Sequence, residues 1–568
     1  MRFRISLILF LSLGACSAPA DLLLVNGRVY TLAWSDPAGD GSAATDAPHG
    51  PDGWSPDGSV VAIRDGQILQ VGGAEVAKRY RSGATNVIDL NGATVVPGLV
   101  DSHTHVIEMG MSQSKLSLLG LDDLDSILDA MRERARTLPA GEWLLAHSFD
   151  EGAWADRYPT KEPLDRLFGD RPVYVRGLHG FAGWLNSAAL RAAGIGPGTP
   201  DPVGGTIVRG ADGEPNGMLL NNAVQLSDAA VPPPSDDALD DAVVTGLRIM
   251  AAAGYVSVHE AGLDARGQAA IERLAAADRL PIRVYAMLKA TETELARKWL
   301  AKGPDPVGDS MLTTRAIKGY YDGSLGARGA RLLEDYRDQP GHRGVSGEDY
   351  GFDRELVAQL ADAGFQIGIH AIGDAGNREV LDFYASLQPR ADARHRIEHA
   401  QVVHPGDFVR FAELGLIASM EPAHCVEDMP WVHDRIGVER AEGAYAWRTF
   451  RSNGVLLALN SDLPGSSMDF FYGMHSAVTR QSRAGDPAGG WHPAERLTAE
   501  EVLRGYTAWN AYAAHLEDRT GTLEPGKWAD ITVLNVDPLR LGDEDPPGLL
   551  RGRVVTTIVA GRVVYDGR

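Results

Sequence analysis

The sequence is poor in cysteine and has no excess of positive charge. Its 568 residues include 2 cysteines, Cys16 and Cys425, which exclude a disulfide framework and a four-cysteine metal site. Lys and Arg number 54 against 76 Asp and Glu, and the resulting charge of −22 argues against a nucleic-acid partner, whose binding requires a basic face. No Gly-x-Ser-x-Gly segment occurs, so nothing supports a serine hydrolase.

The N-terminus has an apolar run that is too short to span a membrane. Arg2 and Arg4 precede this run, residues 5–13, which is the pattern of a secretory signal. The segment Leu13-Gly-Ala-Cys16 resembles the bacterial lipoprotein box, in which the cysteine becomes the lipidated first residue. We therefore expect residues 1–15 to be a signal peptide. Cys16 would carry the lipid that anchors the protein to the bacterial cell envelope, facing the periplasm. A plain secretory signal cut nearby is the alternative.

Both ends of the remaining chain are rich in short strand-like runs. Residues 16–97 contain such runs around Asn-Gly and Asp-Gly turn signals, and residues 521–568 have the same character. Neither end has enough strands for a stable sheet of its own. We predict that the two ends combine into one small composite β-sandwich domain.

The central block, residues 98–520, alternates β-rich runs with helical stretches. This alternation predicts an α/β fold with a parallel sheet, and a (β/α)8 TIM barrel is the leading form. A doubly wound sheet is the alternative, but no Gly-x-Gly-x-x-Gly segment follows an early strand. Predicted strands include residues 254–259, 282–286, 365–369, 416–419 and 455–459, and predicted helices include 121–136, 238–253, 354–363 and 499–504.

The strongest chemical feature is a His-x-His pair at the end of an apolar strand. Residues 95–105 run from Val-Val-Pro-Gly-Leu-Val into Asp-Ser-His103-Thr-His105. Alternation along a strand places residues i and i+2 on the same face. Both imidazoles can therefore reach one metal ion from the mouth of a barrel, where the active sites of such barrels lie. A lone His-x-His pair is weak evidence for a metal site. The interpretation therefore depends on whether other candidate ligands occur elsewhere in the chain.

Four later strands also end in residues that can bind or bridge a metal: Lys318, His370, His399 and Asp462. A (β/α)8 barrel uses roughly 31 residues per strand and helix. At that spacing His370 and His399 are one unit apart, and His399 and Asp462 are two. The four residues then fit strands 4, 5, 6 and 8 if the His-x-His pair ends strand 1. The long gap before Lys318 predicts an insertion, which we place at about 130–240.

The combined pattern resembles that of the amidohydrolase superfamily, in the branch that includes N-substituted formamide deformylase-like proteins. The matching segments are Lys318 with Asp322-Gly-Ser-Leu-Gly326, His370-Ala-Ile-Gly-Asp374, Arg396-Ile-Glu-His399, Ser461-Asp-Leu-Pro464 and, near the end, Gly521-Thr-Leu-Glu-Pro-Gly-Lys-Trp-Ala-Asp-Ile531. The resemblance covers nearly the whole chain after the signal and implies one or two bound divalent ions, zinc being the expected metal.

The resemblance also implies a role for each ligand. His103 and His105 would bind one ion, and His370 and His399 the other. Lys318 would bridge the ions after reacting with CO₂ to form a carbamate, because an ammonium group has no lone pair to offer. Asp462 would bind or adjoin the first ion. It would also act as the general acid and base in the hydrolysis of an amide or formamide C–N bond of a small molecule by a metal-activated hydroxide.

Three further residues are candidates for substrate binding: His179 in the insertion, Asp322 after strand 4, and His424 after strand 7. Two other functions stay open. One is a deaminase or other hydrolase of the same superfamily with a single metal ion. The other is a non-catalytic lipoprotein built on an enzyme frame. The sequence predicts neither the substrate nor the oligomeric state.

Overall fold

The computed structural model describes residues 18–139, 141–150, 158–178, 180–388, 390 and 392–568. The predicted signal peptide, the predicted lipidation site Cys16 and His179 lie outside the described residues. Within these ranges, no helix is both long enough and apolar enough to cross a membrane.

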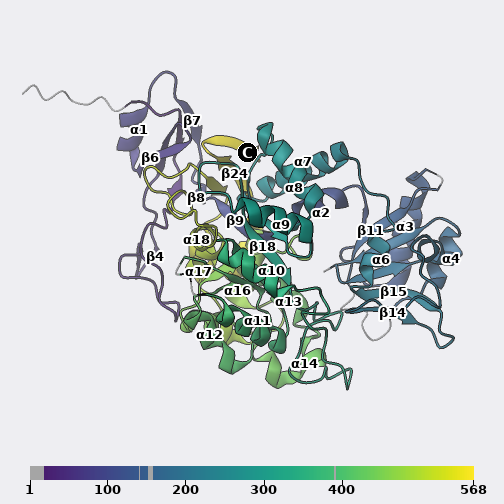
Figure 1. Ribbon diagram of the computed structural model, residues 1–568. Coiled ribbons are helices and arrows are strands. Elements are labelled where there is room, and N and C mark those ends of the chain that lie inside the picture. Colours follow the sequence, from purple (N-terminus) through teal and green to yellow (C-terminus); the bar gives the residue numbers. More distant parts are fainter. Residues whose placement is uncertain (1–17, 140, 151–157, 179, 389, 391) are drawn as a thin grey trace, which may run out of the picture.

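Eight parallel strands form the central sheet (Figure 1). In spatial order they are β9 (Leu99–Thr104), β16 (Tyr255–Leu263), β17 (Arg283–Lys289), β18 (Leu312–Tyr320), β19 (Gln366–Ala371), β20 (Arg396–His399), β21 (Ile417–Met420) and β22 (Leu457–Leu459). Where β9 meets β22, the hydroxyl of Ser102 donates to the carbonyl oxygen of Leu459, and Thr104 forms a parallel bridge with Leu463. The sheet is therefore a nearly closed barrel, which confirms the predicted TIM-barrel-like α/β fold.

Helices between the strands cover the outside of the barrel. The main ones are α7 (Asp236–Ala252), α8 (Ala265–Ala276), α9 (Thr293–Lys302), α10 (Arg354–Asp362), α11 (Asp374–Ser386), α12 (Phe408–Glu413), α15 (Trp447–Ser452), α16 (Phe470–Thr479), α17 (Ala499–Gly505) and α18 (Ala508–Ala513). Several begin at side chains that accept a hydrogen bond from the first turn. Ser235, Asp264 and Asp353 cap α7, α8 and α10 in this way.

The helix that follows the His-x-His pair packs unusually close to a neighbour. Helix α2 (Val106–Ser112) crosses α7 at two glycines. A Cβ atom added to Gly110 would lie 1.9 Å from the carbonyl oxygen of Ala242, and one added to Gly246 would lie 2.1 Å from that of Val106. Only glycine allows this approach, so α7 fixes the position of the segment directly after His105.

An insertion between α2 and α7 forms a second sheet beside the barrel (Figure 1). Its strands, in spatial order, are β10 (Leu116–Ser117), β11 (Leu144–Phe149), β12 (Val173–Gly177), β13 (Ala182–Leu185), β15 (Pro215–Asn221) and β14 (Gly205–Arg209). Its helices are α3 (Leu124–Thr137), α4 (Glu162–Phe168), α5 (Ser187–Ala192) and α6 (Val224–Asp228). Buried side chains such as Trp184 and Met218 form a core separate from that of the barrel.

The two ends of the chain share one sheet. A four-stranded sheet comes wholly from the first part: β6 (Gln67–Gly72), β5 (Val60–Arg64), β1 (Leu22–Val25) and β7 (Asn86–Asp89), with helix α1 (Ala74–Tyr80) and a separate hairpin of β3 (His49–Gly50) and β4 (Gly53–Trp54). A five-stranded sheet joins β2 (Arg28–Val29) and β8 (Thr94–Pro97) to β23 (Ile531–Leu534), β24 (Val554–Val559) and β25 (Arg562–Asp566). The antiparallel pair of β8 and β23 makes the junction. Whether these sheets act as one sandwich domain stays a prediction.

Candidate metal centre

The six side chains named as candidate metal-binding residues line one cavity of about 320 Å³ at the carboxyl end of the barrel. They are His103, His105, Lys318, His370, His399 and Asp462. The imidazole ring centres are close: 5.4 Å separates His103 from His105, 5.0 Å separates His103 from His399, and 4.5 Å separates His370 from His399. These residues come from the ends of β9, β18, β19 and β20 and from the loop after β22.

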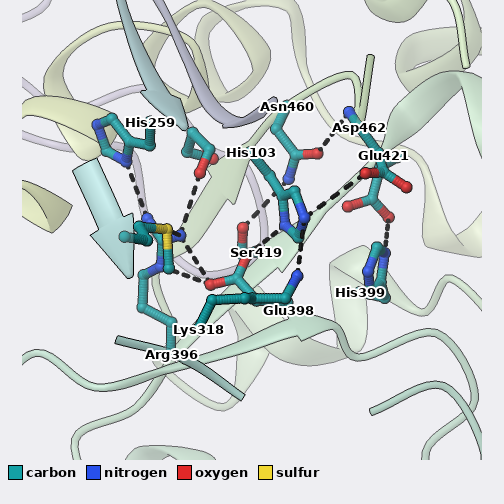
Figure 2. Close-up of polar contacts among 12 residues, drawn as sticks. His103, His259, Lys318, Arg396, Glu398, His399, Ser419, Glu421, Asn460 and Asp462 are labelled. Carbon is teal, nitrogen blue, oxygen red and sulfur yellow. Dashed lines mark hydrogen bonds and ion pairs between the residues drawn. The ribbon is translucent and has the colours of Figure 1, made fainter. Parts of the chain in front are cut away.

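Polar atoms of these residues lie within reach of a shared ion. Oδ1 of Asp462 is 3.2 Å from Nε2 of His105 and 3.5 Å from Nε2 of His103. Nζ of Lys318 is 2.8 Å from Nε2 of His103 (Figure 2). One ligand atom from each of His103, His105 and Asp462 lies within 4.8 Å of the others, which is the spacing that a single ion could bridge.

Two of the six owe their direction to an unusual backbone. Strand alternation would place His399 on the face opposite to Glu398, away from the barrel interior. Instead His399 has φ 72° and Ala400 has φ 42°, both outside the strand region, and the His399 ring meets those of His103 and His370. Asp462 likewise has φ 50°. Such positive φ values are unfavourable for residues other than glycine and cluster at functional sites.

A buried network of polar side chains contacts His103 on the Nδ1 side of its ring. Oε2 of Glu398 lies 2.7 Å from Nδ1 of His103, and Nε of Arg396 donates to Oε1 of the same carboxylate at 2.7 Å (Figure 2). Arg396 in turn contacts Nδ1 of His259 at 2.9 Å. Burial raises the pKa of Glu398, but Arg396 and His103 outweigh it and hold that pKa well below its usual value. The charged carboxylate therefore fixes the ring so that Nε2 faces the cavity, as partners of metal-binding histidines do.

The protonation states suit metal binding. Burial, helped by Lys318, lowers the pKa of His103 to about 4, and burial lowers that of His370 well below its usual value. Neutral imidazoles are the form that binds metals. Nε2 of His370 is buried and forms no hydrogen bond among the described residues, although Oδ1 of Asp322 lies 3.4 Å from it. The residues therefore fit a divalent ion.

Lys318 fits the expectation of a reactive amine. Its side chain is 1% exposed, and no ion pair among the described residues includes it. Burial lowers its pKa to about 8, so the neutral amine is more accessible near neutral pH than in an exposed lysine. A buried cation without a carboxylate partner is costly, and a neutral amine avoids this penalty.

The residues predicted to bind substrate have different surroundings. Asp322 does not line the cavity: it is fully buried and accepts backbone N–H bonds from Ile372, Gly373 and Arg331 at 2.8–2.9 Å. Burial raises its pKa to about 7. Its Oδ1 also lies 3.4 Å from Nε2 of His370. Asp322 therefore shapes the loop after His370 and contacts the ring of that residue. His424 does line the cavity, with Nδ1 3.6 Å from Oε2 of Glu421.

Two residues near the centre were missed by the sequence reasoning. Glu421 follows β21, is 1% exposed, and has Oε2 3.2 Å from Nδ1 of His399 (Figure 2). It lies within 4.8 Å of possible ligand atoms on His103 and His399. Its position at the end of a predicted strand was the signal that could have found it. Glu398 lies inside a quoted motif, and its place on the same strand face as Arg396 was the corresponding signal.

Comparisons with known proteins identify the family of this chain. The sequence profile described as the amidohydrolase family matches residues 86–565, which is most of the chain. The chain belongs to the amidohydrolase family. This membership makes it a metal-binding hydrolase of carbon–nitrogen bonds.

Amidohydrolase relatives cover almost the whole chain. YtcJ of Bacillus subtilis, which is named as an amidohydrolase, is 35% identical over 513 residues, covering 89% of this chain and 96% of that protein. The N-substituted formamide deformylase of Arthrobacter pascens is 27% identical over 525 residues, covering 89% and 94%. Among solved structures, a metal-dependent hydrolase from Pyrococcus furiosus has a TM-score of 0.69 at 26% identity, covering 91% of this chain and 99% of that one.

Proposed function

We propose that this amidohydrolase cleaves an amide or formamide C–N bond of a small molecule at a centre of one or two divalent ions. The observation that carries the proposal is the convergence of four histidines, a buried lysine and an aspartate on one cavity at the carboxyl end of the barrel. The similarity to a protein named N-substituted formamide deformylase supports the bond type.

The donor geometry suggests how the ions would be held. His103, His105 and Asp462 would hold one ion, and His370 and His399 a second. Lys318, as a carbamate formed with CO₂, would bridge the two. Imidazole nitrogen and carboxylate oxygen are ligands that zinc prefers, so zinc is the ion that we propose.

Asp462 is the proposed general acid and base. A divalent ion bound beside it would supply an activated water and an acceptor for the negative charge that develops on the carbonyl oxygen. Asp462 Oδ1 lies 3.2 Å from His105, at the edge of the cavity. There it would take the proton of the attacking water and deliver it to the leaving nitrogen. The buried Glu398 would keep His103 in the tautomer that presents Nε2 to the ion.

The experiment is an activity screen of the zinc-loaded protein against formamides, N-acyl amines, cyclic amides and esters. We expect turnover of at least one formamide or amide, with esters as poorer substrates. The Asp462→Asn variant should lose about 10²- to 10⁴-fold in kcat while it still binds metal. Asp434→Asn, at an exposed residue of α14 (Val432–Ala441), is the control. Metal-loaded protein inert toward the whole panel, or an unchanged Asp462→Asn variant, would contradict the proposal.

We further propose that the enzyme works at the bacterial cell envelope, held by a lipid on Cys16 and facing the periplasm. The Arg2 and Arg4 charges, the short apolar run and the Leu-Gly-Ala-Cys segment support this proposal. Cys16→Ser should move the protein from the membrane fraction to the soluble periplasmic fraction and leave its specific activity unchanged. Protein that stays in the membrane fraction after this change would refute the anchor.

A further inference from the structure

The charged residues around the cavity fall into distinct groups. Besides the histidines, the described residues that line it include seven acidic or basic side chains: Glu108, Arg176, Asp228, Lys289, Lys318, Asp428 and Asp462. Lys318 and Asp462 belong to the proposed metal centre. The remaining five have no role in that centre. Their ion pairs indicate which of them could contact a substrate.

Three of the five are joined by ion pairs. Arg176 on β12 has Nη1 2.8 Å from Oδ2 of Asp228 on α6 and Nε 3.4 Å from Oε1 of Glu108 on α2. The guanidinium therefore already has two carboxylate partners. The Arg176–Glu108 pair links the insertion to the barrel, and both of its groups already have a partner of opposite charge.

The other two, Lys289 and Asp428, have no ion pair with any described residue. Lys289 is the last residue of β17, and Asp428 is the last residue of α13 (Pro422–Asp428), which follows β21. β17 and β21 are the third and seventh of the eight barrel strands. In a closed ring of eight, these strands lie on opposite sides. Lys289 and Asp428 thus line the same cavity and belong to segments that start from opposite sides of the barrel.

The surroundings of Asp428 indicate a prepared binding group. The residue is 6% exposed, and its Oδ2 accepts hydrogen bonds from Nε2 of Gln401 at 2.8 Å and from the hydroxyl of Tyr445 at 2.7 Å. No hydrogen bond among the described residues uses its Oδ1. Burial raises the pKa of Asp428 to about 7, and His424 offsets this only in part. An ammonium group or N–H donor in the cavity would therefore stabilise the charged form of this carboxylate. The nearby Trp431 also lines the cavity and could contact a cation through its ring.

We propose that Lys289 and Asp428 determine specificity by binding the two opposite charges of a zwitterionic substrate. This substrate would be an amide with a carboxylate on one side and an ammonium group on the other, as in N-acylated diamino acids. The inference rests on the proposed amide hydrolysis, in which water adds across the C–N bond and releases a carboxylic acid and an amine.

A matched set of four formamides tests the inference. Nα-formyl-lysine carries both charges, N-formyl-norleucine only the carboxylate, N-(5-aminopentyl)formamide only the ammonium group, and N-pentylformamide neither. We expect kcat/KM of the zinc-loaded protein to be highest for Nα-formyl-lysine, with a loss of about 10- to 100-fold for each missing charge.

Two variants identify the residue behind each preference. Asp428→Asn should remove the advantage of the ammonium-bearing compounds and leave the carboxylate preference, and Lys289→Gln should do the reverse. Neither should change kcat/KM for N-pentylformamide more than about twofold. The controls are Asp434→Asn and Lys298→Gln, at exposed residues of α14 and α9.

A binding measurement makes the test independent of turnover. Nα-methanesulfonyl-lysine keeps both charges but has a sulfonamide in place of the formamide. Its affinity, measured by calorimetry, should fall about 10- to 100-fold in each variant. Equal kcat/KM for all four formamides, or unchanged affinity in both variants, would overturn the inference while amide hydrolysis stands. If no formamide is cleaved but the sulfonamide still binds through both residues, the proposed function fails and the charge recognition stands.

Discussion

The carboxylate behind His103 offers a sharp test of how the protein prepares its metal centre. Glu398 uses one oxygen for Nδ1 of His103 and the other for Nε of Arg396, both at 2.7 Å, and it is fully buried. Glu398→Gln keeps the shape but replaces one acceptor oxygen by an N–H donor. That donor must then face either the Arg396 guanidinium or the protonated Nδ1 of His103, and both are donors themselves.

The expected cost has two parts. Arg396 would lose its carboxylate inside the barrel, and breaking a buried ion pair typically lowers the free energy of unfolding by about 3–5 kcal/mol. His103 would lose the partner that fixes its ring, which typically weakens metal affinity by about 10- to 100-fold. Urea unfolding of the metal-free protein measures the first effect, and competition with a chromophoric chelator measures the second.

Glu413→Gln, at an exposed residue of α12, is the matched control and should change neither quantity. If Glu398→Gln bound zinc as tightly as the parent protein, the role of Glu398 in orienting His103 would be wrong. A variant that unfolded more easily but kept its metal affinity would limit Glu398 to balancing the charge of Arg396.

Three further changes test other parts of the structure. Lys318→Met should remove the bridging group and reduce the amount of bound zinc. In native mass spectrometry, the parent protein should exceed the mass of its unmodified chain by one CO₂. Equal zinc content in the parent protein and the variant would contradict the bridge. Asp322→Asn should lower the free energy of unfolding by about 1–3 kcal/mol in urea titrations, because its amide group cannot accept all three backbone N–H bonds. Gly246→Ala should destabilise the protein by about 1–3 kcal/mol and weaken zinc binding, since a Cβ there would lie 2.1 Å from the Val106 carbonyl oxygen next to His105; an unchanged urea midpoint would show that α2 can move aside.

The residues that the sequence located well are those whose direction follows from strand periodicity. His103 lies inside β9, His105 follows that strand, and Lys318 and His370 lie near the ends of β18 and β19. The predicted helix at 238–253 corresponds to α7 (Asp236–Ala252) for a similar reason, since its apolar spacing is regular. The local sequence pattern was sufficient to place these residues and this helix.

Other features depend on contacts between distant segments. Glu398 and His103 are 295 residues apart, so no local pattern reveals their contact. The positive φ values of His399 and Asp462 have no sequence signal, because these residues are not glycine. The prediction that Asp322 binds substrate came from a motif, and motif membership alone does not distinguish a loop-shaping carboxylate from one that faces the cavity.

Anomalous X-ray diffraction from crystals of the zinc-loaded protein, collected at the zinc absorption edge, tests the central claim most directly. The account predicts one or two anomalous peaks in the barrel cavity, about 2.0–2.2 Å from imidazole nitrogens of His103 and His105 and from Asp462. A second peak would lie beside His370 and His399. Crystals that show no peak in this cavity, or zinc bound only elsewhere on the protein, would contradict it.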